Sequence, residues 1–223
     1  MIIPEEGSLL LVNKPKSWTS FDVVNKLRYL LKIKKIGHAG TLDPLASGLL
    51  LIGVGKYTKK LESLQGLDKT YEGIIEIGKT TPSFDLETPF DSSSDYMHVT
   101  PQQIAVVVEA LTGELDQIPP IYSAIKVNGQ RAYKSARKNE IIELKSRKIK
   151  VYKFEITRVH LPEIHFRVVC SKGTYIRSLA KDLGEKLGVG GYLKELVRTR
   201  VGGYKLENAF QLEQLVDQIN SEK

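Results

Sequence analysis

The stretch GHAGTLDPLASG, residues 37–48, joins a lysine-rich segment to the apolar run LLLIGV (49–54). It holds one carboxylate, Asp43, between Leu42 and Pro44, and it contains three glycines. Glycine lets a backbone adopt positive φ or approach another group closely, and proline fixes its own φ. Taken alone, Leu-Asp-Pro is typical of a turn that the aspartate side chain caps. With the glycines around it, the stretch predicts a stiff loop that presents one carboxylate and leads into a buried strand.

Helices and strands are predicted on both sides of this loop. SLLLVNK (8–14) has the composition of a buried strand, and residues 20–32 place apolar side chains at helical spacing behind Thr19 or Ser20 as N-cap. After LLLIGV, a short helix should run through Lys59 and Leu61. KTYEGIIEIG (69–78) alternates as a half-buried strand does.

The second half of the chain continues this mixture. Residues 81–95 are polar and contain proline, which predicts a loop. The next helix should begin behind Thr100, with Pro101 at its first position and Gln103 completing a capping box, and should end at Gly113. Asn128-Gly129 is a turn signal. The remaining predicted elements are a strand pair over 148–160 and 163–171, a helix over 173–188, a strand around 192–201 and a helix from about Gln211.

This order of elements predicts an α+β fold rather than a doubly wound sheet, because strands and helices do not alternate strictly. The chain has 223 residues and shows no repeat and no long linker, so we expect residues 1–223 to form a single catalytic domain. No apolar run approaches the roughly 18 residues of a membrane helix. The first residues lack the basic and apolar regions of a signal peptide, and Cys170 is the only cysteine, which together favour the cytoplasm.

The net charge and the absence of several motifs narrow the classes of partner and cofactor that we expect. The formal charge is +7 and the pI is about 9.3, which favours an anionic partner, nucleic acid first. The four histidines show no metal-ligand spacing, and no phosphate-binding glycine motif is present, so we expect neither a metal nor a nucleotide cofactor. Cys170 lies in an apolar strand, where a core thiol is more common than a nucleophile. Carboxylate, arginine and tyrosine remain as the catalytic side chains.

Five blocks of the sequence resemble the TruB-type tRNA pseudouridine synthases. They occur in the order of that family and cover nearly the whole chain: VNKPKSWTS with GHAGTLDPLASG (12–20 and 37–48), DKTYEG (68–73), PPIYSAIKVNGQRAY (119–133), CSKGTYIRSLAKDLG (170–184) and LVRTRVGG (196–203). The resemblance implies the pseudouridine-synthase fold, a mixed and largely antiparallel sheet flanked by helices with a catalytic cleft.

The resemblance also implies a reaction. Members convert a uridine of the tRNA T loop, position 55, into pseudouridine without metal or organic cofactor, and their catalytic aspartate corresponds to Asp43. Asp43 would act on a flipped-out base by attack at the ribose anomeric carbon, by attack at C6, or by elimination through a glycal, and the sequence leaves all three open. An ionised carboxylate in a dry pocket needs a cation nearby. The family assigns that role to Arg177, which would otherwise be an ordinary surface arginine.

The same resemblance implies roles for further residues. Each of these residues also has a simpler, purely structural interpretation. Tyr71, otherwise a core aromatic, would stack on the target uracil and assist proton movement, and His38, otherwise a solvated loop residue, would help to open the T loop. Tyr175 and Leu196 would line the same pocket. Lys14 and Lys59, otherwise surface lysines, would contact phosphate or position the loop.

A basic segment at about residues 120–150 is the family's clasp on the T arm of tRNA, and here it would use Arg131, Lys134, Arg137 and Lys138. A solvated basic face is the simpler interpretation of that segment. Longer members carry a C-terminal PUA domain, for which we expect no room here, and the arginine pair usual after the last leucine is Val197-Arg198. We expect a monomer. The alternative function is an RNA-binding or tRNA-folding protein in which catalysis is secondary.

Overall fold

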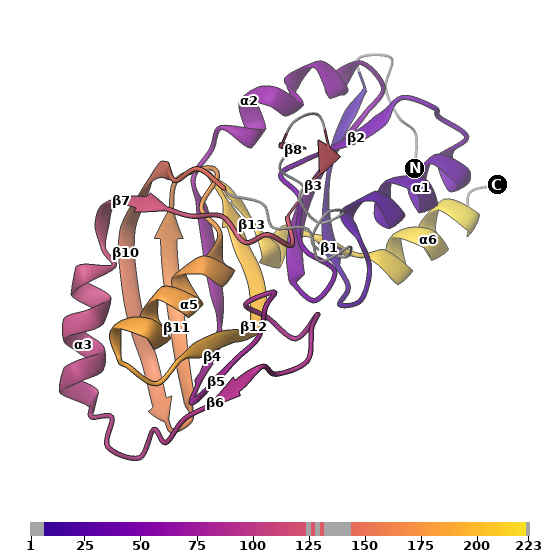
Figure 1. Cartoon of the computed structure of the whole chain (residues 1–223). Coiled ribbons are helices and arrows are strands. Elements are labelled where there is room, and N and C mark those ends of the chain that lie inside the picture. The colour runs from indigo at the N-terminus through magenta and orange to yellow at the C-terminus, as the bar shows by residue number, and fades with distance from the viewer. Residues whose placement is uncertain (1–6, 124–125, 128–129, 132–143, 222–223) are drawn as a thin grey trace. The chain divides into compact units, whose positions relative to one another are not determined.

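The computed structural model describes residues 7–123, 126–127, 130–131 and 144–221 (Figure 1). The chain divides into two compact units, unit 1 with residues 1–72 and 196–223, and unit 2 with residues 73–195. Two strands, β4 (Lys69–Ile77) and β12 (Gly191–Val201), continue from one unit into the other. In the described part of the chain, no helix is both long enough and apolar enough to span a bilayer.

Unit 1 is built on strands that pair around β3. The strand order is β14-β1-β3-β12, with β2 also paired to β3 and β13 to β12; β1 and β2 run antiparallel to β3, and β12 runs parallel to it. Besides the ends of β4 and β12, its elements are β1 (Ser8–Lys14), α1 (Ser20–Leu31), β2 (Ile36–Ala39), β3 (Ser47–Val54), η1 (Gly55–Lys60), α2 (Leu61–Gln65), β13 (Tyr204–Lys205), η2 (Leu206–Asn208), β14 (Phe210–Gln211) and α6 (Leu212–Ser221).

Strand β3 is buried on both faces, which explains its uninterrupted apolar sequence. Leu50 and Ile52 belong to a cluster formed with α1 and α6, whereas Leu49 and Leu51 belong to a second cluster that includes side chains of α2 and η1. Because both faces pack, a one-residue shift of register would exchange the two sets, so the position of the following and preceding loops is tightly specified.

Helix α1 begins and ends where its local chemistry requires. The Thr19 hydroxyl accepts from the backbone N–H of Asp22, and the Asp22 carboxylate accepts from the N–H of Thr19, which completes a capping box. The helix ends at Lys32, which has a positive φ of 55°. One turn earlier, the Arg28 guanidinium donates to the carbonyl of Ile36 at 2.7 Å and so holds the helix end against β2.

Unit 2 contains the strand order β12-β4-β11-β10-β7, and β10 pairs antiparallel with both β7 and β11. Helices α3 and α5 pack against each other, and α3 also packs against β10 (Figure 1). Its further elements are β5 (Lys79–Thr80), β6 (Ser92–Ser93), α3 (Pro101–Ala110), β7 (Gly113–Gln117), β8 (Lys126–Val127), β9 (Gln130–Arg131), β10 (Arg147–His160), β11 (Glu163–Cys170) and α5 (Ile176–Lys186).

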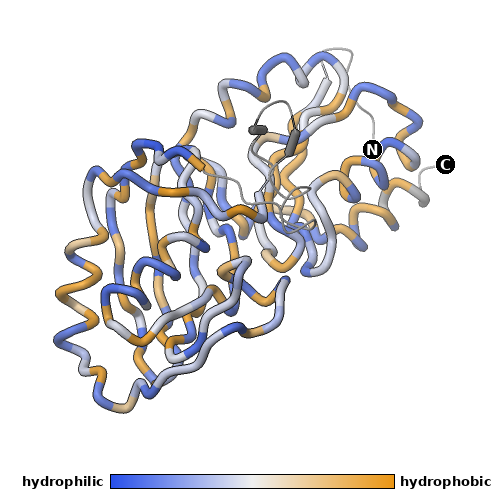
Figure 2. The backbone as a smooth tube through the Cα atoms, in the orientation of Figure 1, coloured by the Kyte–Doolittle hydropathy of each residue, from blue (hydrophilic) through white to orange (hydrophobic). Residues whose placement is uncertain are grey.

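Hydrophobic and hydrophilic residues alternate along several of these strands (Figure 2). Every second residue of β11 is buried, from Ile164 to Cys170. The capping box at Thr100 and Gln103 forms as predicted. Cys170 is fully buried at the end of β11, which confirms its interpretation as a core residue.

The α+β fold with a mixed sheet of ten strands among the described residues is confirmed, whereas several local predictions were wrong. Residues 36–39 lie in strand β2 rather than in the loop, because they pair with β3. Helix α3 ends at Ala110, and Gly113 instead begins β7. Strand β4 is not half-buried in strict alternation, since three consecutive residues at each of its ends are buried. Helix α5 begins at Ile176, three residues later than expected.

Candidate active site

The loop that carries Asp43 connects β2 to β3, and it is held by short-range bonds in unit 1. The Ser20 hydroxyl, buried at the start of α1, accepts from the backbone N–H of Leu42 at 2.9 Å and lies 3.2 Å from the Leu42 carbonyl. The Asp43 carbonyl accepts from the N–H of Ala46 at 3.1 Å. Gly40 has a φ of 80°, which a side chain would disfavour. The backbone on both sides of Asp43 is therefore fixed.

Arg198 of β12 binds both ends of this loop. Its guanidinium donates to the Gly40 carbonyl from Nη2 at 3.0 Å and to the Leu49 carbonyl from Nε at 2.8 Å, and the side chain is only 1% exposed. The backbones of Gly48 and Arg198 also pack closely against each other. A Cβ on Gly48, where φ is 105°, would lie 2.5 Å from the Arg198 carbonyl oxygen. A rigid guanidinium fork suits two acceptors at fixed positions.

Lys14, at the end of β1, lies on the other side of the loop and is fully buried. Its ammonium donates to the carbonyls of Trp18 at 2.6 Å, Pro15 at 2.9 Å and Pro44 at 3.4 Å. Burial lowers the pKa of Lys14 to about 8, while the Asp43 carboxylate raises that pKa and the Arg198 charge lowers it further. Of the two roles expected for Lys14, this geometry favours positioning of the loop over contact with phosphate.

A third cation, Lys69 of β4, is buried near the first residue of the loop. Its ammonium donates to the carbonyls of Gln65 and Leu67, and its Cε lies 3.8 Å from the position that a Cβ on Gly40 would occupy. Unit 1 thus buries three cationic side chains near the loop, and no Asp or Glu among its described residues is buried. Positive charge therefore dominates the interior beside the loop.

His38 lies in β2, opposite Ile52, and is half-buried. Burial lowers its pKa, and the nearby Arg198 charge lowers it further, so the imidazole is neutral at neutral pH. Its Nδ1 is buried and has no hydrogen-bond partner among the described residues. A neutral ring suits hydrogen bonding or stacking with a base better than it suits contact with a phosphate.

Arg177, the second residue of α5, lies in unit 2 and is 2% exposed rather than at the surface. Its guanidinium donates to the Ser83 carbonyl at 3.1 Å and to the Tyr122 carbonyl at 2.8 Å, and Nη1 is 3.5 Å from an oxygen of the buried Asp85. Asp43 belongs to unit 1, so its pairing with Arg177 stays a prediction.

The start of α5 is fixed by Gln117 of β7. The Gln117 side chain accepts from the backbone N–H of Tyr175 at 2.8 Å and donates to the Tyr175 carbonyl at 3.0 Å. The Tyr175 ring is half-buried and faces the Arg147 guanidinium, whose carbon lies 4.4 Å from the ring centroid. Two residues before Arg177, the chain therefore offers one ordered aromatic ring.

The other predicted site residues are placed as follows. Tyr71 is buried in β4, Leu196 is half-buried in β12, and Lys59 is exposed in η1. Lys134, Arg137 and Lys138 lie outside the described residues, and of Arg131 only its place in β9 is described. Among the described residues, no group of three or more His, Cys, Asp or Glu is arranged to hold a metal ion.

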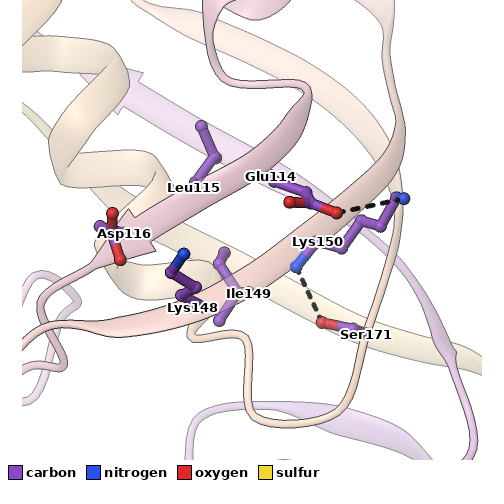
Figure 3. A pocket seen from close by; sticks show the side chains of 7 residues that line it. All are labelled: Glu114, Leu115, Asp116, Lys148, Ile149, Lys150 and Ser171. Atoms are coloured by element: carbon purple, nitrogen blue, oxygen red, sulfur yellow. Dashed lines mark hydrogen bonds and ion pairs between the residues drawn. The ribbon is translucent and has the colours of Figure 1, made fainter.

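A groove in unit 2 holds none of the predicted site residues. It has a volume of about 490 Å³ and is lined by residues of the paired strands β7 and β10, where Glu114 pairs with Lys150 at 3.6 Å (Figure 3). The Ser171 hydroxyl accepts from the backbone N–H of Lys150 at its edge. Paired charges and a strand edge line this groove, so its residues do not form an active site.

Comparison with known proteins decides the family. The model of the TruB family pseudouridylate synthase N-terminal domain matches residues 28–176, and that of the tRNA pseudouridylate synthase B C-terminal domain matches residues 177–223. This chain belongs to the TruB family. A tRNA pseudouridine synthase B from Flavobacterium johnsoniae is 54% identical over 93% of both chains, and one from Phocaeicola vulgatus is 46% identical over 98% of this chain and 96% of its own.

A solved Cbf5-Nop10-Gar1 complex contains a chain that is 32% identical, with a TM-score of 0.75 over 96% of this chain. The present chain spans 54% of the length of that chain. Membership of the TruB family confirms the resemblance, the pseudouridine-synthase fold and an isomerase activity.

Four further residues contact or adjoin predicted site residues or the Asp43 loop, each within its own unit. Asp85 falls in a predicted polar loop, although its carboxylate is buried beside Arg177. Arg198 was noted only as part of an unusual pair, and neither Lys69 nor Gln117 was singled out. Each of the four acts through contacts with residues distant in sequence or with backbone carbonyls, which leave no local pattern.

The depressed pKa of Lys14 predicts a pH dependence of stability. Below about pH 8 Lys14 is charged in both states, whereas between about 8 and 10.5 the unfolded chain keeps a proton that the folded chain has lost. The folded state therefore gains stability from this group as the pH rises through that window. The free energy of unfolding of the wild type, minus that of Lys14→Met, should increase between pH 7.5 and 9.5 in urea titrations. A difference that stays constant or decreases would contradict the burial of a charged Lys14.

Arg198 should act as a positioning residue for Asp43. Arg198→Lys keeps the charge but cannot bind the Gly40 and Leu49 carbonyls together, so the loop loses its fixed geometry. Since a displacement of about 1 Å can cost on the order of 100-fold, we expect kcat to fall at least about ten-fold while KM changes about two-fold or less. Arg158→Lys, at an exposed position of β10, is the matched control. A folded Arg198→Lys variant with the kcat of the wild type would exclude the role.

Proposed function

We propose that this protein isomerises the uridine at position 55 in the T loop of tRNA, with Asp43 as the catalytic carboxylate acting on a flipped-out base. The observation that carries the proposal is the loop of Asp43, which Arg198 and Lys14 hold at both sides within a positively charged interior. A turn that served only to connect β2 and β3 would not need two buried cations. The tRNA pseudouridine synthase B relatives give the substrate class.

The reaction is a balanced rearrangement of the base. The bond from ribose C1′ to N1 breaks, the uracil rotates, and a bond from C1′ to C5 forms. C5 loses its proton and N1 gains one, so no oxidant, reductant or co-reactant is consumed. Asp43 would serve in its ionised form, either as the nucleophile at C1′ or C6 or as the base that leads to a glycal.

The surrounding residues take roles that suit their environments. Tyr71, buried in β4, would stack on the uracil and assist the transfer of the C5 proton, and Arg177 would stabilise the charge of Asp43. Tyr175 and Leu196 would complete the pocket. His38, neutral at physiological pH, would contact the T loop where the target base leaves its stack.

The RNA backbone would be held by the basic arm at about residues 120–150, through Arg131, Lys134, Arg137 and Lys138. Phosphate contacts of this kind position the substrate without reading its sequence. Lys59 would add a contact from unit 1. We infer a cytoplasmic monomer that acts on the T arm without metal or cofactor.

The decisive experiment compares wild type with Asp43→Asn on an unmodified tRNA transcript. The amide keeps the shape of the side chain but supplies no negative charge, so tRNA binding should change little while the product disappears. Pseudouridine is mapped by a selective chemical modification followed by primer extension, and a transcript with cytidine at position 55 is the matched control RNA.

Two results would overturn the proposal. Appreciable pseudouridine from the purified Asp43→Asn variant would remove Asp43 from the chemistry. Tight binding by a wild type that forms no pseudouridine at position 55 would instead favour a tRNA-folding protein.

A further inference from the structure

A second basic surface lies in unit 1, on two segments that flank the hairpin of β2 and β3. From residue 23 to residue 61 the chain has eight lysines and arginines and a single acidic residue, Asp43 itself. Seven of the eight are exposed. The six of them that follow α1 or lie in η1 are here called the lysine surface: Lys32, Lys34, Lys35, Lys56, Lys59 and Lys60.

Backbone pairing brings the two segments together. Because β2 runs antiparallel to β3, its first residue, Ile36, lies opposite Val54, the last residue of β3 (Figure 1). The Lys35 carbonyl accepts from the N–H of Gly55 at 2.7 Å, so the turn before β2 adjoins the start of η1. The Arg28 bond to the Ile36 carbonyl fixes the same turn from the helix side. The lysine surface is therefore a feature of the ordered fold.

These lysines lack the carboxylate partners that other lysines have. Lys79, Lys181 and Lys205 each form an ion pair, with Glu76 at 3.7 Å, Glu185 at 2.7 Å and Glu207 at 2.8 Å respectively. Among the described residues, no ion pair is formed by any member of the lysine surface. Gathered like charges repel one another, and an anionic partner would relieve that repulsion.

The distance between the lysine surface and the loop of Asp43 corresponds to a few nucleotides of a nucleic-acid backbone. The lysine surface and the loop of Asp43 lie at opposite ends of β2, a strand of four residues that spans about 13 Å. Phosphates of one strand follow at about 3.4 Å along a helix axis. A nucleotide flipped toward Asp43 would therefore have backbone only a few nucleotides away within reach of the lysine side chains.

We propose that the lysine surface binds the phosphodiester backbone of the tRNA that Asp43 acts on, as a second contact in addition to the basic arm. This assignment rests on the proposed function for the identity of the RNA. Lysine suits the role, since it interacts with phosphate as a point charge and such a contact does not depend on the base sequence. The surface would contribute affinity and would leave the choice of uridine to the catalytic pocket.

The test neutralises Lys34, Lys35 and Lys56 together by Lys→Gln. Lys32 is excluded because of its positive φ, and Lys59 because it is already assigned to the substrate. The matched control is Lys79→Gln with Lys181→Gln and Lys205→Gln, which removes the same charge from lysines that already have partners. A third variant with Lys→Arg at 34, 35 and 56 keeps the charge. Circular dichroism checks that each variant is folded.

Dissociation constants for tRNA are measured from 50 to 300 mM salt. Each phosphate contact adds about 0.7 to 0.9 to the slope of log K against log salt, so three lost contacts should reduce its magnitude by about two and weaken binding about ten-fold at 0.1 M. The control and the Lys→Arg variant should bind like the wild type.

Pseudouridine formation by the wild type, measured in parallel, separates this proposal from the proposed function. A wild type that forms the product, together with a Lys→Gln triple variant of unchanged affinity and slope, would overturn the lysine surface alone. Unchanged tRNA affinity with lost binding to anionic lipid vesicles would overturn it as well and assign the surface to a membrane.

Discussion

Both ends of the loop that carries Asp43 are bound by one side chain, the guanidinium of Arg198. It reaches the Gly40 and Leu49 carbonyls at the same time, and the Arg198 backbone leaves no room for a side chain on Gly48. This contact is possible because β12 pairs in parallel with β3 at residue 48. The register of β3, fixed by burial on both of its faces, therefore also fixes the position of the Asp43 loop.

The contacts that hold the Asp43 loop also place positive charge in the interior of unit 1. Lys14, Lys69 and Arg198 are all buried in unit 1, and burial lowers the pKa of Lys14 to about 8. Three buried cations whose side chains contact or adjoin one loop give this part of unit 1 a positive interior. A field of this sign attracts negative charge to the loop. The same side chains thus hold the loop in place and make its surroundings positive.

Sequence patterns predicted the elements whose signals are local. The N-cap of α1, the capping box of α3, the apolar run of β3 and the pair β10–β11 follow from neighbouring residues, whereas the catalytic role of Asp43 stays a prediction from its motif. The strand at residues 36–39 and the burial of Arg198 and Asp85 depend on partners far along the chain, so no local pattern reveals them. The single-domain prediction stays a prediction for a chain with two compact units, as does the pairing of Asp43 with Arg177.

Hydrogen exchange of the loop amides tests the central claim, that Arg198 holds the Asp43 loop rigid. In the wild type, the amides of Leu42 and Ala46 should be protected, since both donate to fixed acceptors. In Arg198→Lys these amides should exchange at least about ten-fold faster, while amides in the centre of β1 and β3 keep their rates. Equal loop protection in the two folded proteins, or an unprotected loop in the wild type, would contradict the account.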